Sequence, residues 1–255
     1  MLPFLACILL AAPPARCAVA SPRTTQAAPV SVPRAQDAAE ATRRARELES
    51  GARAAWKAKD SAGARTRAAE AVAILVALPD AACDDASDAA LSDLGALGVD
   101  VGELAASRAA LEHLVARREK TRPPDDPDLL QALSDLGGTL GRQGDHAAAR
   151  VLFERVLEAR RRTLPADDLR LFRSMLSLAE SLRRLRAIDA ARALQEEALA
   201  GLEGMPSVPA RDLARARLGM ASTLYLQSDF AGARAPGTRR RGLRGGVRRG
   251  GRAVA

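Results

Sequence analysis

Apolar residues recur every three or four positions along most of this chain, the spacing that places them on one face of an α-helix. The pattern begins at Asp37, and proline, glycine and acidic residues interrupt it at regular intervals. Asp126-Pro127 is typical of a helix start, and Gly144 is typical of a turn between two helices. The predicted helices span residues 37–59, 62–78, 87–97, 103–120, 127–142, 145–163, 168–185, 187–204 and 209–227. The sequence therefore predicts an all-α protein built of antiparallel helix pairs.

One hexapeptide occurs twice, at residues 90–95 and again at 132–137, with a spacing of 42 residues. The same spacing relates Leu136, Leu178 and Met220. A unit of this length cannot bury its own apolar face, so neighbouring units must stack against one another. We therefore expect an α-solenoid over residues 37–235.

Small residues occupy two positions of each unit, twelve residues apart, where they would let the two helices of a pair approach closely. The first set is Gly137, Ala179 and Ala221, and the second is Ala149, Ala191 and Ala233. A leucine follows the first set at Leu140, Leu182 and Leu224. With Gly144, Phe153 and Val156, this pattern resembles the tetratricopeptide repeat in its 42-residue, kinesin-light-chain-like variety. The pair at 87–120 carries Gly98 where leucine is expected, which predicts a short or frayed first helix.

The resemblance implies that the first helices of successive repeats line a concave groove that holds a peptide or a partner helix. By register, the groove-facing residues are Gln131, Ser134, Gly138, Gly141 and Arg142, then Arg173, Leu176, Glu180, Arg183 and Arg184, then Arg215, Leu218, Ser222 and Tyr225. Because guanidinium groups bind carboxylates through two hydrogen bonds, these arginines favour an acidic segment or a terminal carboxylate. The alternative is an ordinary solvated helix face.

Composition and charge support this assignment. Aromatic residues make up 2% of the chain, so the core must consist mainly of Ala, Leu and Val. The net charge of +8 comes from eight arginines at the two ends, and the remaining chain has 31 basic and 31 acidic residues. A neutral body lacks the basic surface typical of nucleic-acid binding, so that function is the least favoured.

The first twenty residues are typical of a signal peptide, with a short apolar stretch and a cleavage site after Ala20. This predicts export to the periplasm or the medium, no stable membrane span after cleavage, and Cys83 as the one remaining cysteine. An uncleaved apolar tail on a cytoplasmic protein is the alternative. Residues 21–36 contain three prolines and predict a flexible linker.

The repeat pattern stops at Ala235, and residues 236–255 contain seven arginines and no acidic residue. One interpretation is a disordered Arg/Gly tail. The other is a shift of reading frame, because one permitted set of codons for 237–245 encodes a suitable second helix in another frame. We expect the helix before this segment to lack its packing partner.

The sequence predicts no catalytic, cofactor or metal site. The carboxylate pairs Asp125-Asp126 and Asp167-Asp168 precede predicted helices and are typical of caps. His113 and His146 have no partner at the spacing of metal ligands. We therefore expect a non-enzymatic scaffold for protein–protein interactions of undetermined oligomeric state. The alternative is the N-terminal repeat region of a larger enzyme, such as a caspase-like (CHAT) peptidase.

Overall fold

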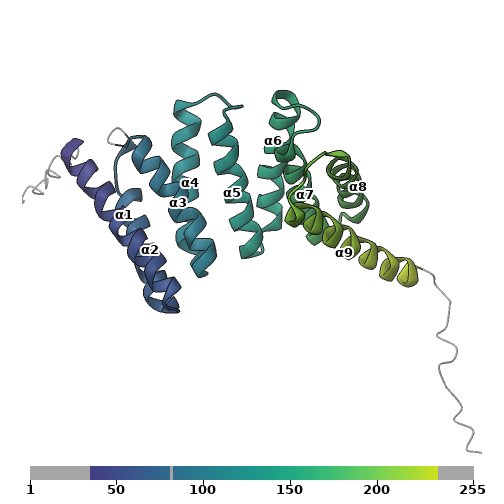
Figure 1. Ribbon diagram of the computed structural model, residues 1–255, viewed down its shortest axis with the longest axis horizontal. Helices are drawn as coiled ribbons and strands as arrows, with labels where there is room; N and C mark the ends of the chain where they lie inside the picture. The colour runs from purple at the N-terminus through teal and green to yellow at the C-terminus, as the bar shows by residue number, and fades with distance from the viewer. Residues whose placement is uncertain (1–34, 81–82, 235–255) are drawn as a thin grey trace, which may run out of the picture. The chain divides into compact units, whose positions relative to one another are not determined.

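The computed structural model describes residues 35–80 and 83–234, and this part of the chain consists of α-helices and turns (Figure 1). The helices are α1 (Ala35–Lys57), α2 (Ser61–Val76), α3 (Asp85–Val101), α4 (Leu104–Thr121), α5 (Pro127–Gln143), α6 (His146–Thr163), α7 (Leu169–Arg184), α8 (Ile188–Gly204) and α9 (Ala210–Arg234). The all-α prediction is confirmed. The predicted signal peptide, nearly all of the linker and the Arg/Gly tail lie outside the described residues.

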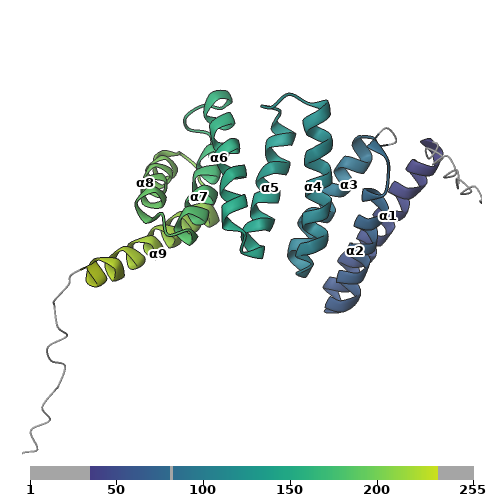
Figure 2. The same ribbon diagram turned by 180° about the vertical axis from the view of Figure 1, so that it is seen from behind.

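Consecutive helices pack against one another along the whole described part of the chain (Figures 1 and 2). Each odd-numbered helix also contacts the next odd-numbered helix. Helix α1 begins two residues earlier than predicted, so Ala35 and Gln36 are helical and not part of a linker. None of the described helices is both long and apolar enough to cross a bilayer. The arrangement is a solenoid of helix pairs.

The turns inside the pairs share a backbone conformation. Lys59, Gly102, Gly144 and Arg186 all have positive φ, at 64°, 80°, 90° and 66°. This left-handed conformation ends one helix and reverses the chain, and it costs a non-glycine residue about 1–2 kcal/mol. Because Lys59 and Arg186 adopt it without being glycine, packing of the two helices against each other must supply the compensating energy.

Helix α9 does not contain the corresponding turn. The 42-residue register places it at Ser228, directly after the predicted helix 209–227, yet α9 continues through this residue to Arg234. The prediction of a helix end at 227 is therefore wrong. The physical reason is that no described helix packs beyond Ser228, so nothing offsets the cost of a left-handed serine. Leu218, Leu224 and Tyr225 of α9 are exposed.

Helix α3 is also longer than predicted, since it passes through Gly98 and ends at Val101. A Cβ atom at Gly98 would lie 2.8 Å from the Cβ of Ser107 on α4. Gly98 therefore permits close approach of two helices and does not end one. The stop is Gly102, with its positive φ.

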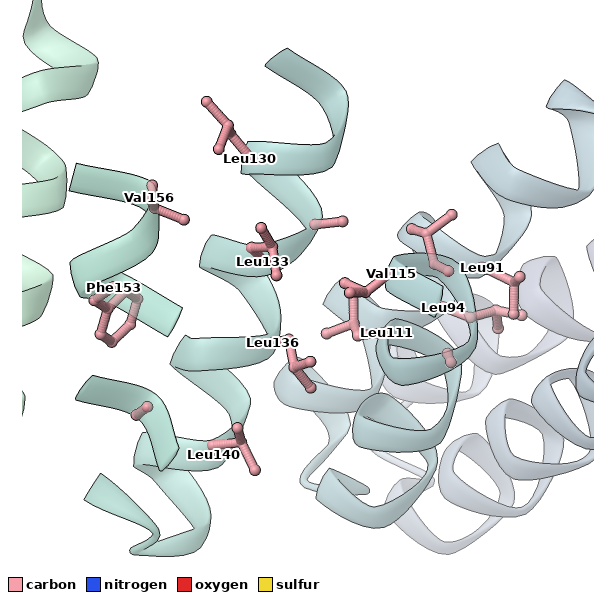
Figure 3. Close-up of a cluster of buried hydrophobic side chains, with 14 of the residues drawn as sticks. Leu91, Leu94, Leu111, Val115, Leu130, Leu133, Leu136, Leu140, Phe153 and Val156 are labelled. Carbon is pink, nitrogen blue, oxygen red and sulfur yellow. The ribbon is translucent and has the colours of Figure 1, made fainter. Parts of the chain in front are cut away.

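The core consists of leucines and small residues between the helices (Figure 3). A Cβ atom at Gly137 of α5 would lie 2.9 Å from the ring of Phe153 on α6, so only glycine fits there without a shift. Ala149 and Ala179 are fully buried. The predicted use of small residues for close helix packing is thus confirmed in these pairs.

Two buried hydroxyl groups link neighbouring repeats. The Ser107 hydroxyl of α4 donates to the Gly95 carbonyl of α3 at 2.7 Å. Its oxygen lies 3.0 Å from Oγ1 of Thr139 on α5. Thr139 Oγ1 also lies 3.1 Å from the Asp135 carbonyl of its own helix, so either hydroxyl can be the donor in the second bond. This chain of bonds crosses from α3 through α4 to α5 inside the apolar core.

Candidate functional site

A groove of about 990 Å³ runs along one side of the described repeats. Its walls come mainly from the odd-numbered helices α3, α5, α7 and α9, as expected for the first helices of successive repeats. Because these helices contact one another in order, residues far apart in the sequence lie along one surface. Gly138 of α5 leaves open space within it, and a Cβ atom at Gly141 would meet Nδ1 of His146 at 3.9 Å.

Half of the residues expected from the register line this groove. They are Ser134, Gly138, Gly141, Arg142, Glu180, Arg184 and Arg215. The others lie outside its lining: Gln131, Arg173, Leu176, Arg183, Leu218, Ser222 and Tyr225. Leu176 is buried, whereas Leu218, Ser222 and Tyr225 lie exposed on α9.

Arg173 joins two helices. Its guanidinium donates to both carboxylate oxygens of Asp212 on α9, at 3.0 and 2.7 Å. This pairing holds the pKa of Asp212 below its usual value, although burial opposes the shift. Since the Asp212 side chain is 7% exposed, the ion pair is nearly dry on that side. Arg173 therefore fastens α9 to α7, and these donors are occupied.

Glu180 neutralises two of the arginines. It accepts hydrogen bonds from Arg183 at 2.6 and 2.9 Å and from Arg184 at 2.8 Å. Burial alone would raise the pKa of Glu180, but the two arginines hold it below its usual value. The charge that these arginines offer to an acidic ligand is correspondingly reduced.

Arg142 and Arg215 are the groove arginines that form no ion pair within residues 35–80 and 83–234. Arg215 donates to the Ser177 hydroxyl at 3.2 Å, and burial lowers its pKa. Arg142 is exposed at the end of α5 and makes no hydrogen bond to any described residue. These two side chains can bind a carboxylate without first giving up an ionic partner in the protein.

The groove also contains three aspartates that sequence reasoning missed: Asp93, Asp100 and Asp135. Asp93 pairs with Arg46 of α1. Asp100 is exposed, and no described cation pairs with it. The pKa of Asp135 is raised by burial, despite a 2.9 Å hydrogen bond from the Gln131 amide. Asp93 and Asp135 both stand in the duplicated hexapeptide, so the register could have identified them.

The neighbouring aspartates that precede α5 and α7 have structural roles. Asp126 accepts hydrogen bonds from two backbone amides at the start of α5, each at 3.0 Å. Asp168 accepts from the amide of Arg170 at 2.7 Å. Both are helix caps, as predicted. Within the described residues, no group of three or more potential ligands could hold a metal ion.

Helix pairs, a groove along the odd-numbered helices and capped helix starts define a helical-repeat scaffold of the protein-interaction type. Two models of the family named tetratricopeptide repeat match the sequence, at residues 87–162 and 171–203. These segments are tetratricopeptide repeats, which confirms the resemblance inferred from the 42-residue spacing.

Solved structures show the same fold. BtubC (BKLC) from P. vanneervenii is 16% identical with a TM-score of 0.57, over 78% of this chain and 85% of that one. The nearly identical TPR-like repeats of a Podosopora anserina chain described as a putative kinesin light chain are 22% identical with a TM-score of 0.55, over 76% and 95%. A variant of the same repeats is 21% identical with a TM-score of 0.57, over 77% and 95%. A comparison with curated proteins finds no match.

Proposed function

We propose that the protein is a non-catalytic scaffold that holds an extended segment of a partner protein in the groove of α3, α5, α7 and α9. The observation that carries this proposal is the groove itself, which combines open space at Gly138 with unpaired polar side chains. Family membership supports it, because helical repeats of this kind offer extended binding surfaces.

Gly138 provides a direct test of this proposal. A Cβ atom there meets no other atom within 4 Å, so the side chain of Gly138→Phe starts in open space and its ring occupies part of the groove. Gly204, at the end of α8, is equally open and does not line the groove. Gly204→Phe is therefore a matched control.

Peptides selected from a display library against the intact chain are the probe. We expect Gly138→Phe to weaken their binding at least tenfold by fluorescence anisotropy, while Gly204→Phe leaves it unchanged. Peptides that bind both variants with the affinity of the original protein would show that the groove is not the binding site.

We also propose export, on the strength of residues 1–20 alone. N-terminal sequencing of the mature protein checks it, and a chain that retains Met1 would contradict it. An acidic ligand and a downstream peptidase domain stay predictions from the sequence.

A further inference from the structure

The unpaired charges of the groove are separated by sign along the stack of helices. The two charged lining residues of α3, Asp93 and Asp100, are acidic. On α5 both signs occur, as Asp135 and Arg142. The one charged residue that α9 contributes is Arg215. The groove therefore changes from acidic at α3 to basic at α9.

Ion pairs within the protein occupy one acidic group on α7 and one on α3, so these two carboxylates are not available to a ligand. Glu180 is occupied by Arg183 and Arg184, so it offers no free negative charge near α7. Asp93 is paired with Arg46, which leaves Asp100 and Asp135 as the acidic groups without an ion pair among the described residues. The available charges are thus Asp100 on α3, Asp135 and Arg142 on α5, and Arg215 on α9, so the sign changes at α5.

Asp135 is a half-buried acidic group of the groove without an ion pair among the described residues. Burial penalises its ionised form by more than the nearby Arg160 and Arg118 favour it, and its hydrogen-bond donor is the neutral amide of Gln131. A cation placed against it would offset that penalty. A uniformly acidic ligand would instead face Asp100 and Asp135 with like charge, which is unfavourable in a partly desolvated groove.

We infer that the segment held in the groove is bipolar, with basic residues against α3 and Asp135 of α5, and acidic residues against Arg142 of α5, α7 and α9. This inference rests on the proposed function and specifies its ligand. Four first helices at about 10 Å per step span ~30 Å, which about nine extended residues cross. The charge separation also fixes which end of the segment lies at α9.

Synthetic peptides of about twelve residues, roughly 40 Å when extended, are the probes. One has a basic amino-terminal half and an acidic carboxyl-terminal half, and a second has the reverse order. Two more, of the same length, are uniformly acidic and uniformly basic. Binding to the intact ¹⁵N-labelled chain is followed by shifts of the Gly138 and Gly141 amide resonances.

The matched variant exchanges two residues that the register makes equivalent. Asp100 and Arg142 stand at the ends of α3 and α5, and neither has an ion pair or side-chain hydrogen bond to any described residue. The double variant Asp100→Arg/Arg142→Asp keeps the composition and net charge of the protein, yet it removes the gradient. Far-UV circular dichroism and Tm check that the exchange leaves the fold intact.

We expect one bipolar peptide to bind more tightly than both uniform peptides, and the exchange to weaken it roughly tenfold at low salt, since attractive pairs become repulsive. The effect should shrink in high salt. Tighter binding of the uniformly acidic peptide, or an exchange without effect, overturns the bipolar assignment. Either result leaves the proposed function intact if Gly138→Phe still blocks binding. If Gly138→Phe has no effect on binding, the proposed function itself is refuted.

Discussion

The pair α5–α6 and the final helix α9 share a register but not an environment. Leu140 on α5 is 5% exposed, and its equivalent on α7, Leu182, is 7% exposed. The equivalent on α9, Leu224, is 43% exposed. Leu140 and Leu182 have a second helix of the pair beside them, whereas α9 has none among the described residues. Burial at a repeat position is therefore a property of the neighbouring helix and not of the residue type.

The largest effect is expected when the equivalent leucines of α5 and α9, Leu140 and Leu224, are each replaced by alanine. Leu140→Ala should lower the free energy of unfolding by about 2–5 kcal/mol, because it opens a cavity in a packed core. Leu224→Ala should cost less than about 1 kcal/mol, since much of that side chain is already in water. Urea unfolding followed by circular dichroism measures both values. Equal losses would mean that α9 is packed as tightly as α5 in solution.

The attachment of α9 can be broken through Arg173. Arg173→Met leaves Asp212 nearly buried without its cation, which should weaken the docking of α9 by about 2 kcal/mol. Hydrogen exchange should then accelerate in α9 and stay unchanged in α5. Arg183→Met is the control, because the Arg183–Glu180 pair lies within α7 and joins no two helices. Similar exchange in both variants would refute a fastening role for Arg173.

Acid should also weaken the attachment of α9, because protonation of Asp212 removes its ion pair with Arg173. The pKa of Asp212 is below its usual value in the folded state, so its stabilising effect is complete above about pH 4 and disappears as the pH falls through the folded pKa. The pKa of Asp135 is raised instead, so its protonation does not destabilise α5. We expect exchange in α9 to rise first below about pH 4, and this acid sensitivity to vanish in Arg173→Met. An identical pH response in Arg173→Met would contradict the assignment.

The smallest effects should come from the turn position. Gly144→Ser places a side chain at φ 90° and should cost about 1–2 kcal/mol. Ser228→Gly removes that cost at the equivalent site, where Gln227 and Asp229 match Gln143 and Asp145. We expect faster hydrogen exchange near residue 228 in this variant, with the global Tm nearly unchanged. Unaltered exchange would show that the missing packing alone keeps α9 straight.

Local pattern predicted most of the fold. The 3.6-residue period, the caps at Asp126 and Asp168 and the turn at Gly144 located the helices to within a few residues. The exceptions, α3 and α9, depend on tertiary packing. Gly98 is a helix breaker by propensity but a contact position in the structure, and Ser228 lacks the neighbour that would make a turn favourable.

The groove was predictable in position but not in charge. The tetratricopeptide resemblance, carried over by register, implied a groove position for Ser134, Arg142 and Arg215, and these residues line the groove. It could not show that Arg173 is bound to Asp212, 39 residues away, because long side chains find partners that depend on the packed arrangement. The expected groove residues include one acid, Glu180, but not Asp135, although Asp135 stands beside Ser134 in the repeated hexapeptide.

The hydroxyl chain from Gly95 through Ser107 to Thr139 has a consequence for assembly of the repeats. An interface of leucine and alanine alone would tolerate one helix sliding by a full turn past its neighbour, since apolar contacts are not directional. A slip of α4 past α3 would break the Ser107 bond to Gly95, at a cost of about 1–3 kcal/mol. A slip of α5 past α4 would forfeit the Ser107–Thr139 bond, about 1 kcal/mol, because Thr139 keeps the Asp135 carbonyl of its own helix. Ser107 and Thr139 therefore fix the axial alignment between one repeat and the next, so that side chains from separate helices meet at the correct height.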